Sequence, residues 1–361
     1  MNPIRVLIVE DSLTVRRRLV DVLAAEPAIQ VVGEAEDGKQ GIERCIALRP
    51  DVVTMDMMMP VMTGLGATEY IMAHCPTPIL IVSSSTNRGE LFKTYEALAA
   101  GAVDVLEKPR GDEPAGDWEA RFIAAIRMVA RIRVVTHLRA SLSSIGHGRP
   151  ELQTPSASMP SVPAGARYEL VVIGASTGGP GAILDVLRSL QPPLPVPLLF
   201  VLHIDEPFAV SFAEWLDGQT AIRVAYARDG DRLSDRVGMV TMAPPDRHLI
   251  VNGGRLRLTQ DPPRHSCRPS VDVLFESVAR EIGPVTIGCL LTGMGRDGAS
   301  GLLDLRNRGG FTIAQDEASS VVYGMPREAV RLGAAERELP LRAIGKTISA
   351  LLAQPVVGPK P

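Results

Sequence analysis

The feature of this sequence that most constrains its fold is an alternation of short apolar runs with stretches of helical period. Five apolar runs of four or five residues occur early in the chain, at residues 6–9, 29–33, 52–55, 79–82 and 103–106. Helical patterns follow them, near residues 13–25, 38–48, 64–74, 89–100 and 117–139. Repeated strand-then-helix units predict a parallel sheet with helices on both faces.

The same alternation resumes after residue 167. Apolar runs predict strands at residues 170–173, 198–202, 224–227, 239–242, 285–291 and 311–314, and helical patterns lie near 180–190, 208–217, 271–282 and 299–308. A hairpin is expected in HLIVNGGRLRL, with its turn at Asn252-Gly253-Gly254. We therefore expect a second α/β unit with a small β insertion, followed by one amphipathic helix after Pro340.

A segment without apolar period separates the two halves. Residues 141–167 are dominated by Ser, Pro and Gly, and such a composition buries too little surface to offset its ordering entropy. We predict an α/β protein with two doubly wound parallel-sheet domains, at residues 1–132 and 168–355. A flexible linker at residues 133–167 is expected to join them.

The composition excludes several classes of protein. A net charge of -3 and an aromatic content of 4% disfavour nucleic-acid binding, which needs a basic field or stacking platforms. The four cysteines stand far apart in sequence, at positions 45, 75, 267 and 289, so we expect free thiols in a reducing compartment and no zinc or redox pair. No apolar stretch approaches the ~20 residues of a membrane span, so a cytoplasmic protein is expected.

Charged and hydroxyl side chains follow four of the five predicted strands of the first domain. They are Glu10, Asp11, Asp56, Ser83 and Lys108. Because parallel strands end at the same edge of a sheet, these side chains should converge. Three carboxylates repel one another, which Mg²⁺ would relieve, and a lysine and a hydroxyl suit a phosphoryl group on Asp56. Any one of these residues alone is explained as a polar turn; the full set is not.

The set resembles that of response-regulator receiver domains, over roughly the first 130 residues. The resemblance implies that Asp56 accepts a phosphoryl group from a histidine kinase. It also implies that Glu10, Asp11 and Asp56, with the backbone carbonyl of Met58, hold Mg²⁺. A flavodoxin-like fold is expected for this domain.

The same resemblance assigns two further residues and exposes two departures. Ser83 matches the switch hydroxyl, and Lys108 matches the lysine that pairs with the phosphoryl group. Glu10 replaces the commoner aspartate, which lengthens that ligand arm. Val105 stands where receivers usually carry an aromatic switch residue, so a swing of an aromatic side chain is not expected here.

A serine turn opens the second domain. Directly after the strand at 170–173, the string Gly174-Ala175-Ser176-Thr177-Gly178 fits G-x-S-x-G, a strand-to-helix turn that exposes the serine hydroxyl. Its backbone N–H groups and helix dipole favour negative charge nearby. Such a turn serves either acyl chemistry or phosphate binding, and from the turn alone both stay open. The absence of G-x-G-x-x-G disfavours a dinucleotide site.

A nucleophilic serine needs a base and an orienting acid. His203 ends the run at 198–202, a strand-tip position like that of Ser176, whereas His248 and His265 lie near the hairpin and in a polar loop. Asp297 sits in a glycine-rich loop before a helix, where it is either the acid or an N-cap. The order Ser–His–Asp differs from that of α/β-hydrolases, so that fold is not the template.

Long stretches of residues 168–340 are similar to the catalytic domain of chemotaxis protein-glutamate methylesterases, the CheB family. They are IGASTGGPGAI, the histidine after the second strand, RPSVDVLFESVA, LLTGMGRDGASGL and TIAQDEASSVVYGMPREAV. A receiver domain in front agrees with that family's architecture. The resemblance implies a Rossmann-like catalytic domain and a cytoplasmic, phosphorylation-regulated serine hydrolase that acts in chemotactic adaptation.

The resemblance also implies a mechanism. Ser176 attacks the γ-glutamyl methyl ester of a chemoreceptor, His203 takes the proton, and Asp297 orients the imidazole. Thr177 and Met294 line the site and support the oxyanion hole, and no cofactor is expected there. Deamidation of receptor glutamines uses the same acyl chemistry. We further expect the unphosphorylated receiver to cover the Ser176 cleft.

One departure lies around the base, where Leu202-His203-Ile204-Asp205 replaces the family's usual Gln-His-Met-Pro. Asp205 adds a charge that would favour the protonated imidazole. Two alternatives to chemoreceptor demethylation therefore stay open. One is a paralogous acyl hydrolase or deamidase of a non-chemotaxis signalling system, and the other is a non-catalytic two-component regulator.

Overall fold

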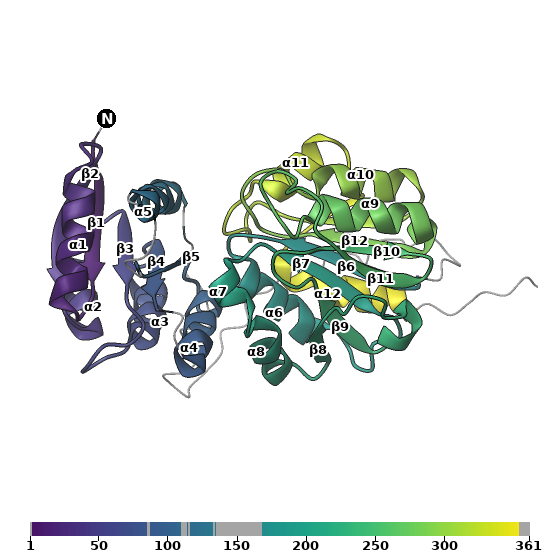
Figure 1. The fold of residues 1–361 in the computed structure, drawn as a ribbon, viewed down its shortest axis with the longest axis horizontal. Helices are drawn as coiled ribbons and strands as arrows, with labels where there is room; N and C mark the ends of the chain where they lie inside the picture. Colours follow the sequence, from purple (N-terminus) through teal and green to yellow (C-terminus); the bar gives the residue numbers. More distant parts are fainter. Residues whose placement is uncertain are drawn as a thin grey trace, which may run out of the picture.

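The computed structural model describes residues 2–84, 87–109, 114, 116–132, 134 and 168–353. Within them the chain forms two α/β units that lie side by side (Figure 1). Apart from residue 134, the predicted linker at 133–167 lies outside the described residues, so its boundaries stay predictions. None of the helices in this part of the chain is both long enough and apolar enough to cross a membrane.

The first unit is a five-stranded parallel sheet in the order β2-β1-β3-β4-β5. Its strands are β1 Ile4–Val9, β2 Ile29–Ala35, β3 Val52–Met55, β4 Ile79–Ser83 and β5 Asp104–Glu107. Its helices are α1 Leu13–Ala24, α2 Gly38–Leu48, α3 Gly64–His74, α4 Arg88–Ala99 and α5 Asp117–Val129. The side chains of Ser12, Asp37, Thr63 and Asn87 cap the first four helices, which explains why these helices begin where the sequence predicts.

The fifth helix is shorter than predicted. A helical pattern runs to residue 139, but α5 ends at Val129. The backbone N–H groups of Arg131 and Ile132 bond to the carbonyls of Met128 and Val129, three residues back. Bonds of that kind tighten the last turn of a helix and close it.

The second unit is a seven-stranded parallel sheet in the order β14-β13-β12-β6-β7-β9-β8. Its strands are β6 Leu170–Ala175, β7 Leu198–Leu202, β8 Arg223–Tyr226, β9 Met239–Met242, β12 Thr286–Leu290, β13 Phe311–Gln315 and β14 Arg337–Leu339. The predicted hairpin is confirmed as β10 His248–Asn252 paired with β11 Arg255–Thr259. Both units therefore have the predicted doubly wound α/β fold.

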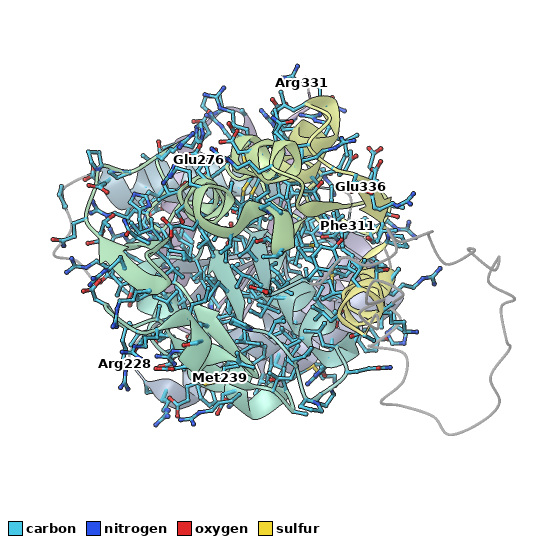
Figure 2. All side chains as sticks on the ribbon, turned by 90° about the vertical axis from the view of Figure 1, so that its right-hand side faces the viewer. Arg228, Met239, Glu276, Phe311, Arg331 and Glu336 are labelled. Carbon is cyan, nitrogen blue, oxygen red and sulfur yellow. The ribbon has the colours of Figure 1, made fainter. Side chains whose placement is uncertain are left out.

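Helices cover both faces of the second sheet. They are α6 Gly179–Ser189, α7 Glu206–Ala209, α8 Phe212–Gln219, α9 Val271–Ile282, α10 Ala299–Asn307, α11 Met325–Arg331 and α12 Leu341–Leu352, with 3-10 turns η1 Leu233–Arg236 and η2 Gly283–Val285. Buried side chains of α6, α8 and α12 pack on one face, and those of α9, α10 and α11 pack on the other. Figure 2 shows side chains filling both layers, with Arg228 and Arg331 at the periphery.

One predicted helix, at residues 208–217, is split into α7 and α8. Tyrosine hydroxyls from other elements donate hydrogen bonds to the backbone carbonyls at the break: Tyr95 donates to Phe208, and Tyr226 donates to Ala209. Because these acceptors are already satisfied, the helix can end there without losing hydrogen bonds. The strand β14 and the helix α11 were not predicted.

The two units share a continuous apolar core. Helix α4 of the first unit packs against α6 and α8 of the second. Tyr95 of α4 is fully buried, its ring lies edge-on to Phe212 at 5.2 Å between centroids, and its hydroxyl donates to the Phe208 carbonyl at 2.7 Å. Ion pairs of Arg88 with Glu214 and of Arg121 with Asp205 border this contact.

Candidate functional site

The acidic residues of the first unit converge as predicted. Strand β1 lies between β2 and β3, so the chain changes direction across the sheet there, and ligands bind at such switch points. Side-chain oxygens of Glu10, Asp11 and Asp56 lie within 4.8 Å of one another. The Lys108 Nζ lies 2.9 Å from Glu10 Oε2 and 2.9 Å from Asp56 Oδ1. This cluster is the candidate phosphoacceptor site.

The charges of this cluster fit a divalent cation. Burial and the neighbouring Asp56 raise the pKa of Glu10 to about 7, although Lys108 opposes the shift. Burial also raises the pKa of Asp56. One lysine thus leaves the carboxylates under-neutralised, and oxygen-rich acidic sites of this kind suit Mg²⁺. The side chain of Met58, two residues past Asp56, is exposed, and the ligand role of its backbone carbonyl stays a prediction.

The predicted switch hydroxyl is held by a residue that the sequence analysis missed. Ser83 Oγ donates to Glu90 Oε1 at 2.7 Å, and the backbone N–H of Ser84 donates to the same oxygen at 2.9 Å. Glu90 is buried in the first turn of α4. The pattern Asn87-x-x-Glu90 is a capping signal, but it gives no sign that the carboxylate turns toward β4.

The serine turn of the second unit has the predicted strand-to-helix geometry. Ser176 lies between β6 and α6, and its backbone N–H bonds to the Thr292 carbonyl at 3.0 Å. Gly178 follows with φ of 75°, and a Cβ there would lie 2.5 Å from Val321 Cβ. Only glycine combines that conformation with that contact, which is why the turn requires it.

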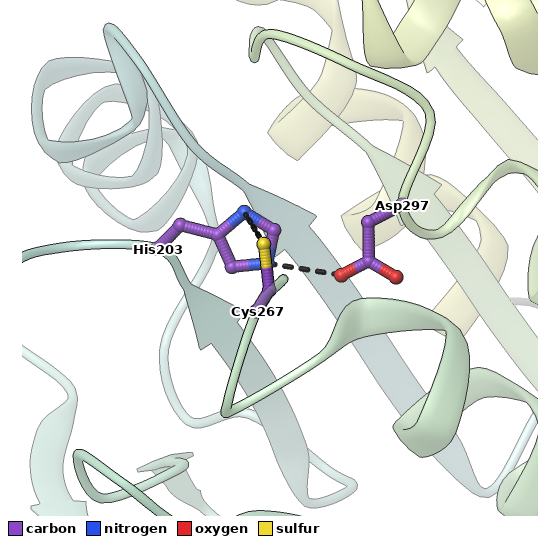
Figure 3. Close-up of side chains that lie close together, drawn as sticks. All are labelled: His203, Cys267 and Asp297. Carbon is purple, nitrogen blue, oxygen red and sulfur yellow. Dashed lines mark hydrogen bonds and ion pairs between the residues drawn. The ribbon is translucent and has the colours of Figure 1, made fainter. Parts of the chain in front are cut away.

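The predicted base and acid meet at the same edge of the sheet. His203 follows β7, the strand beside β6, and its Nε2 lies 2.9 Å from Asp297 Oδ2 (Figure 3). Asp297 is buried and also accepts hydrogen bonds from Ser270 Oγ at 2.7 Å and from the Val271 N–H at 2.7 Å. It therefore holds the start of α9. The alternative of an N-cap on α10 is wrong, because Gly298 occupies that position.

Ser176 and His203 line one pocket of about 390 Å³. Among the described residues, no hydrogen bond joins these two side chains; His203 Nδ1 instead faces Cys267 Sγ at 3.7 Å. Catalytic hydrogen bonds often form only when substrate is bound, so the pocket holds the set in an incomplete arrangement. Cys267 was missed because its loop is distant in sequence from both strands.

The two residues expected to line the site differ in position. Thr177 is nearly buried in the same pocket as Ser176, and its carbonyl accepts from Thr292 Oγ1 at 3.0 Å. Met294 is exposed and lines a neighbouring pocket of about 910 Å³, together with Arg127 of α5 and Arg131 just after that helix. The first unit therefore forms one wall of the Met294 pocket.

The environment of His203 favours its charged form, but not for the predicted reason. Burial opposes protonation, yet the hydrogen bonds with Asp297 and Cys267 outweigh it and raise the pKa of His203 to about 9. Asp205 was expected to cause such a shift, and that expectation is wrong. Its carboxylate is paired with Arg121 at 2.9 Å, a residue of the other unit.

The remaining histidine candidates and cysteines have other environments. His248 is buried between the Pro262 carbonyl and the Ser270 N–H, and His265 bonds Asp272. All four cysteines are free thiols, and Cys75 lies close enough to Cys45 to lower the pKa of the Cys45 thiol to about 7. Packing of α2 on α3 joins them, which their sequence separation does not reveal.

The fold and the two sites define a class of protein, namely a response regulator whose second domain is built like a serine hydrolase. Its sequence matches the family described as response regulator receiver domain over residues 6–114 and the family described as CheB methylesterase over residues 171–348. Among solved structures, the CheB methylesterase catalytic domain of Thermotoga maritima covers 52% of this chain and all of that chain, at 33% identity and a TM-score of 0.49.

Curated relatives match over nearly the whole length. A protein-glutamate methylesterase/protein-glutamine glutaminase 2 from Anaeromyxobacter dehalogenans is 43% identical over 97% of this chain and 97% of its own. A protein of the same description, numbered 4, from Geobacter metallireducens is 42% identical over 96% of this chain and 99% of its own. This chain belongs to the CheB methylesterase family, with a receiver domain in front of the methylesterase domain.

Proposed function

We propose that this protein is a protein-glutamate methylesterase and protein-glutamine glutaminase that acts on the cytoplasmic helices of chemoreceptors and is controlled by its receiver. The observation that carries the proposal is the pairing of His203 with buried Asp297 in the pocket that Ser176 lines. A paired imidazole beside a half-buried serine that lines a pocket is the arrangement that acyl transfer requires. Receptor demethylation places the protein in the cytoplasm.

In the first half of the reaction, Ser176 Oγ attacks the ester carbonyl while His203 takes its proton. Because Asp297 occupies Nε2, the proton goes to Nδ1, and the carboxylate stabilises the resulting imidazolium. The backbone N–H of Thr177 stabilises the oxyanion, where one donor is worth about 10²–10³ in rate; the N–H of Ser176 is bonded to the Thr292 carbonyl. The imidazolium returns the proton to the leaving methoxide oxygen, and methanol departs.

In the second half, His203 removes a proton from water, which attacks the acyl-enzyme. Ser176 Oγ leaves with that proton, and the receptor side chain becomes a free glutamate. With a glutamine substrate the same steps release ammonia instead of methanol. The family's two activities therefore need only one nucleophile and one base.

The receiver is proposed to be phosphorylated on Asp56 by a chemotaxis-type histidine kinase. Bound Mg²⁺, held by Glu10, Asp11, Asp56 and the Met58 carbonyl, would supply positive charge to the phosphoryl oxygens. Lys108 already bridges Glu10 and Asp56, so it can pair with a phosphoryl oxygen without moving far.

The unphosphorylated receiver is proposed to restrict access to the catalytic pocket. Asp104 of β5 lines the same pocket as Ser176, and Arg121 of α5 pairs with Asp205 beside the base. Tyr95 anchors α4 on α7 and α8. A receptor helix would therefore meet the receiver at the entrance to the site.

Ser83 and Glu90 supply the route by which phosphorylation would loosen the contact between the receiver and the second domain. A phosphoryl group on Asp56 attracts the Ser83 hydroxyl, which now donates to Glu90. Loss of that hydrogen bond removes one of the contacts that tie Glu90, in the first turn of α4, to β4, and α4 is the helix that carries Tyr95. The route needs no aromatic side chain at Val105.

The experiment is incubation of the full chain with methylated receptor, with and without a small phosphodonor, while methanol release is measured. Ser176→Ala should lower the rate by about 10⁴-fold or more, and Asp56→Asn should remove the response to phosphodonor. Exposed Ser234→Ala is the matched control. Release of methanol or ammonia only from a non-chemotaxis receptor would reassign the substrate, and hydrolysis by Ser176→Ala at the wild-type rate would overturn the proposal.

A further inference from the structure

The base has a second neighbour besides Asp297, and that neighbour is a thiol. Cys267 Sγ lies 3.7 Å from His203 Nδ1, while Asp297 holds Nε2 on the other edge of the ring (Figure 3). Cys267 sits in the loop between β11 and α9, where its backbone pairs in both directions with Arg264. The side chain is thus presented to the imidazole by a closed turn rather than by a loose end.

We propose that His203 Nδ1 and Cys267 Sγ form a binding site for a soft divalent cation, zinc above all, that inhibits the enzyme. Zinc binds imidazole at about 2.0–2.1 Å and thiolate at about 2.3 Å, so a tetrahedral angle separates the two donors by about 3.6 Å. The two donor atoms already lie 3.7 Å apart. A zinc ion would therefore enter between them with little rearrangement of the loop.

Asp297 would support the metal site by orienting His203, without binding the metal itself. A histidine that binds a metal commonly donates its other N–H to a carboxylate, which fixes the ring. His203 Nε2 already makes that contact with buried Asp297 at 2.9 Å. One donor atom from each of His203, Cys267 and Asp297 lies within 4.8 Å of the others, so the three groups form one compact cluster.

The donor chemistry separates this site from the one in the receiver. Thiolate and imidazole are soft or borderline ligands that suit zinc, whereas Mg²⁺ prefers oxygen. The pocket beside the pair has a volume of about 390 Å³, which leaves room for water at the remaining positions of the ion. Binding exchanges the thiol proton of Cys267 for the metal and involves no oxidation.

The consequence for catalysis rests on the proposed function, although the binding itself does not. In the mechanism above, Nδ1 is the nitrogen that accepts the proton of Ser176. A metal ion on Nδ1 removes that lone pair from use. Zinc should therefore stop ester hydrolysis reversibly, and a chelator should restore it.

The first test uses Co²⁺ as a spectroscopic probe of the full chain, with Mg²⁺ in excess to occupy the receiver. Thiolate coordination to Co²⁺ gives a near-ultraviolet charge-transfer absorption. Titration of the wild type should develop that band, and Cys267→Ala or Cys267→Ser should lose it with at least about a tenfold fall in affinity. Cys75→Ala is the matched control, since it removes the contact between Cys45 and Cys75 and should keep the band.

The second test measures ester hydrolysis against zinc concentration for each variant, relative to its own rate in chelator. Zinc should inhibit the wild type and Cys75→Ala, and about tenfold more zinc should be needed for the Cys267 variants. An equal affinity of Cys267→Ala and wild type for both metals would overturn the inference. A band that depends on Cys267 in a protein without esterase activity would uphold the metal site and reject the proposed function.

Discussion

The acidic cluster of the receiver and the catalytic pocket occupy equivalent places, because each lies beyond the carboxyl ends of a parallel sheet at its switch point. They differ in how complete they are. In the receiver, Lys108 already reaches Glu10 and Asp56. In the second domain, His203 is bonded to Asp297 but faces Cys267 instead of Ser176. The residues of the receiver site therefore already make the contacts that the proposed phosphorylation uses. The catalytic pocket still lacks the contact between His203 and Ser176 that the proposed hydrolysis needs.

The largest expected effect tests the part of the catalytic pocket that is already assembled. Asp297→Asn should lower methanol release by about 10⁴-fold, because the amide no longer stabilises the imidazolium and can reverse the hydrogen bond to Nε2. The control is Asp304→Asn, at an exposed position on α10. A rate for Asp297→Asn within about tenfold of wild type would mean that the His203–Asp297 pair is structural only.

The pH dependence tests the charge of the base. The pKa of His203 is raised to about 9, so the imidazole is mostly protonated near neutral pH and cannot accept a proton. The rate in chelator should therefore rise as pH increases, by about 50-fold between about pH 7 and about pH 9. Cys267→Ala should move the midpoint downward, because the Cys267 contact is one cause of the raised value. A rate that does not change between about pH 7 and about pH 9 would contradict a base whose pKa is raised by Asp297 and Cys267.

Glu90→Gln tests the route that leads from the receiver site to the interface. The charged acceptor of the Ser83 hydroxyl is replaced by a neutral amide, and hydrogen bonds to charged groups contribute about 1.5–3 kcal/mol. Ser83 should then turn toward the phosphoryl group more readily, so that about tenfold less phosphodonor gives half-maximal activation. Exposed Glu43→Gln is the control. An unchanged dose response for Glu90→Gln would remove Glu90 from the route.

Tyr95→Phe tests the interface itself and should have the smallest effect. The substitution deletes only the hydroxyl that donates to the Phe208 carbonyl, and one such bond contributes about 0.5–1.5 kcal/mol. Basal methanol release without phosphodonor should rise by about 2–10-fold, while the fully activated rate should stay the same. Tyr70→Phe, on the outer side of α3, should leave both rates unchanged. A fall in the basal rate would show that the contact does not restrain the enzyme.

Both sheets and the convergence of Glu10, Asp11 and Asp56 could be predicted because they depend on local periodicity and on the rule that parallel strands end at one edge. The location of His203 in one pocket with Ser176 could be predicted in the same way, from its position after β7. Strand β14 could not be predicted, because its three residues are too few to show a hydrophobic period.

The functional residues that the sequence did not reveal were missed for a different reason. Glu90, Cys267 and Tyr95 act through partners that only tertiary packing supplies. The misjudged role of Asp205 belongs with them, because Arg121 of the other domain neutralises it. Sequence patterns locate the groups that end strands, but they do not reveal which side chain from a distant loop or domain turns toward those groups.

The most direct test of the account is labelling of the full chain with a fluorophosphonate, followed by mass spectrometry with and without phosphodonor. We expect a single adduct on Ser176, formed faster when Asp56 is phosphorylated and lost in His203→Ala. An adduct at another residue, or labelling of Ser176 at the same rate in wild type and His203→Ala, would contradict the assignment of this pocket as a receiver-controlled esterase site.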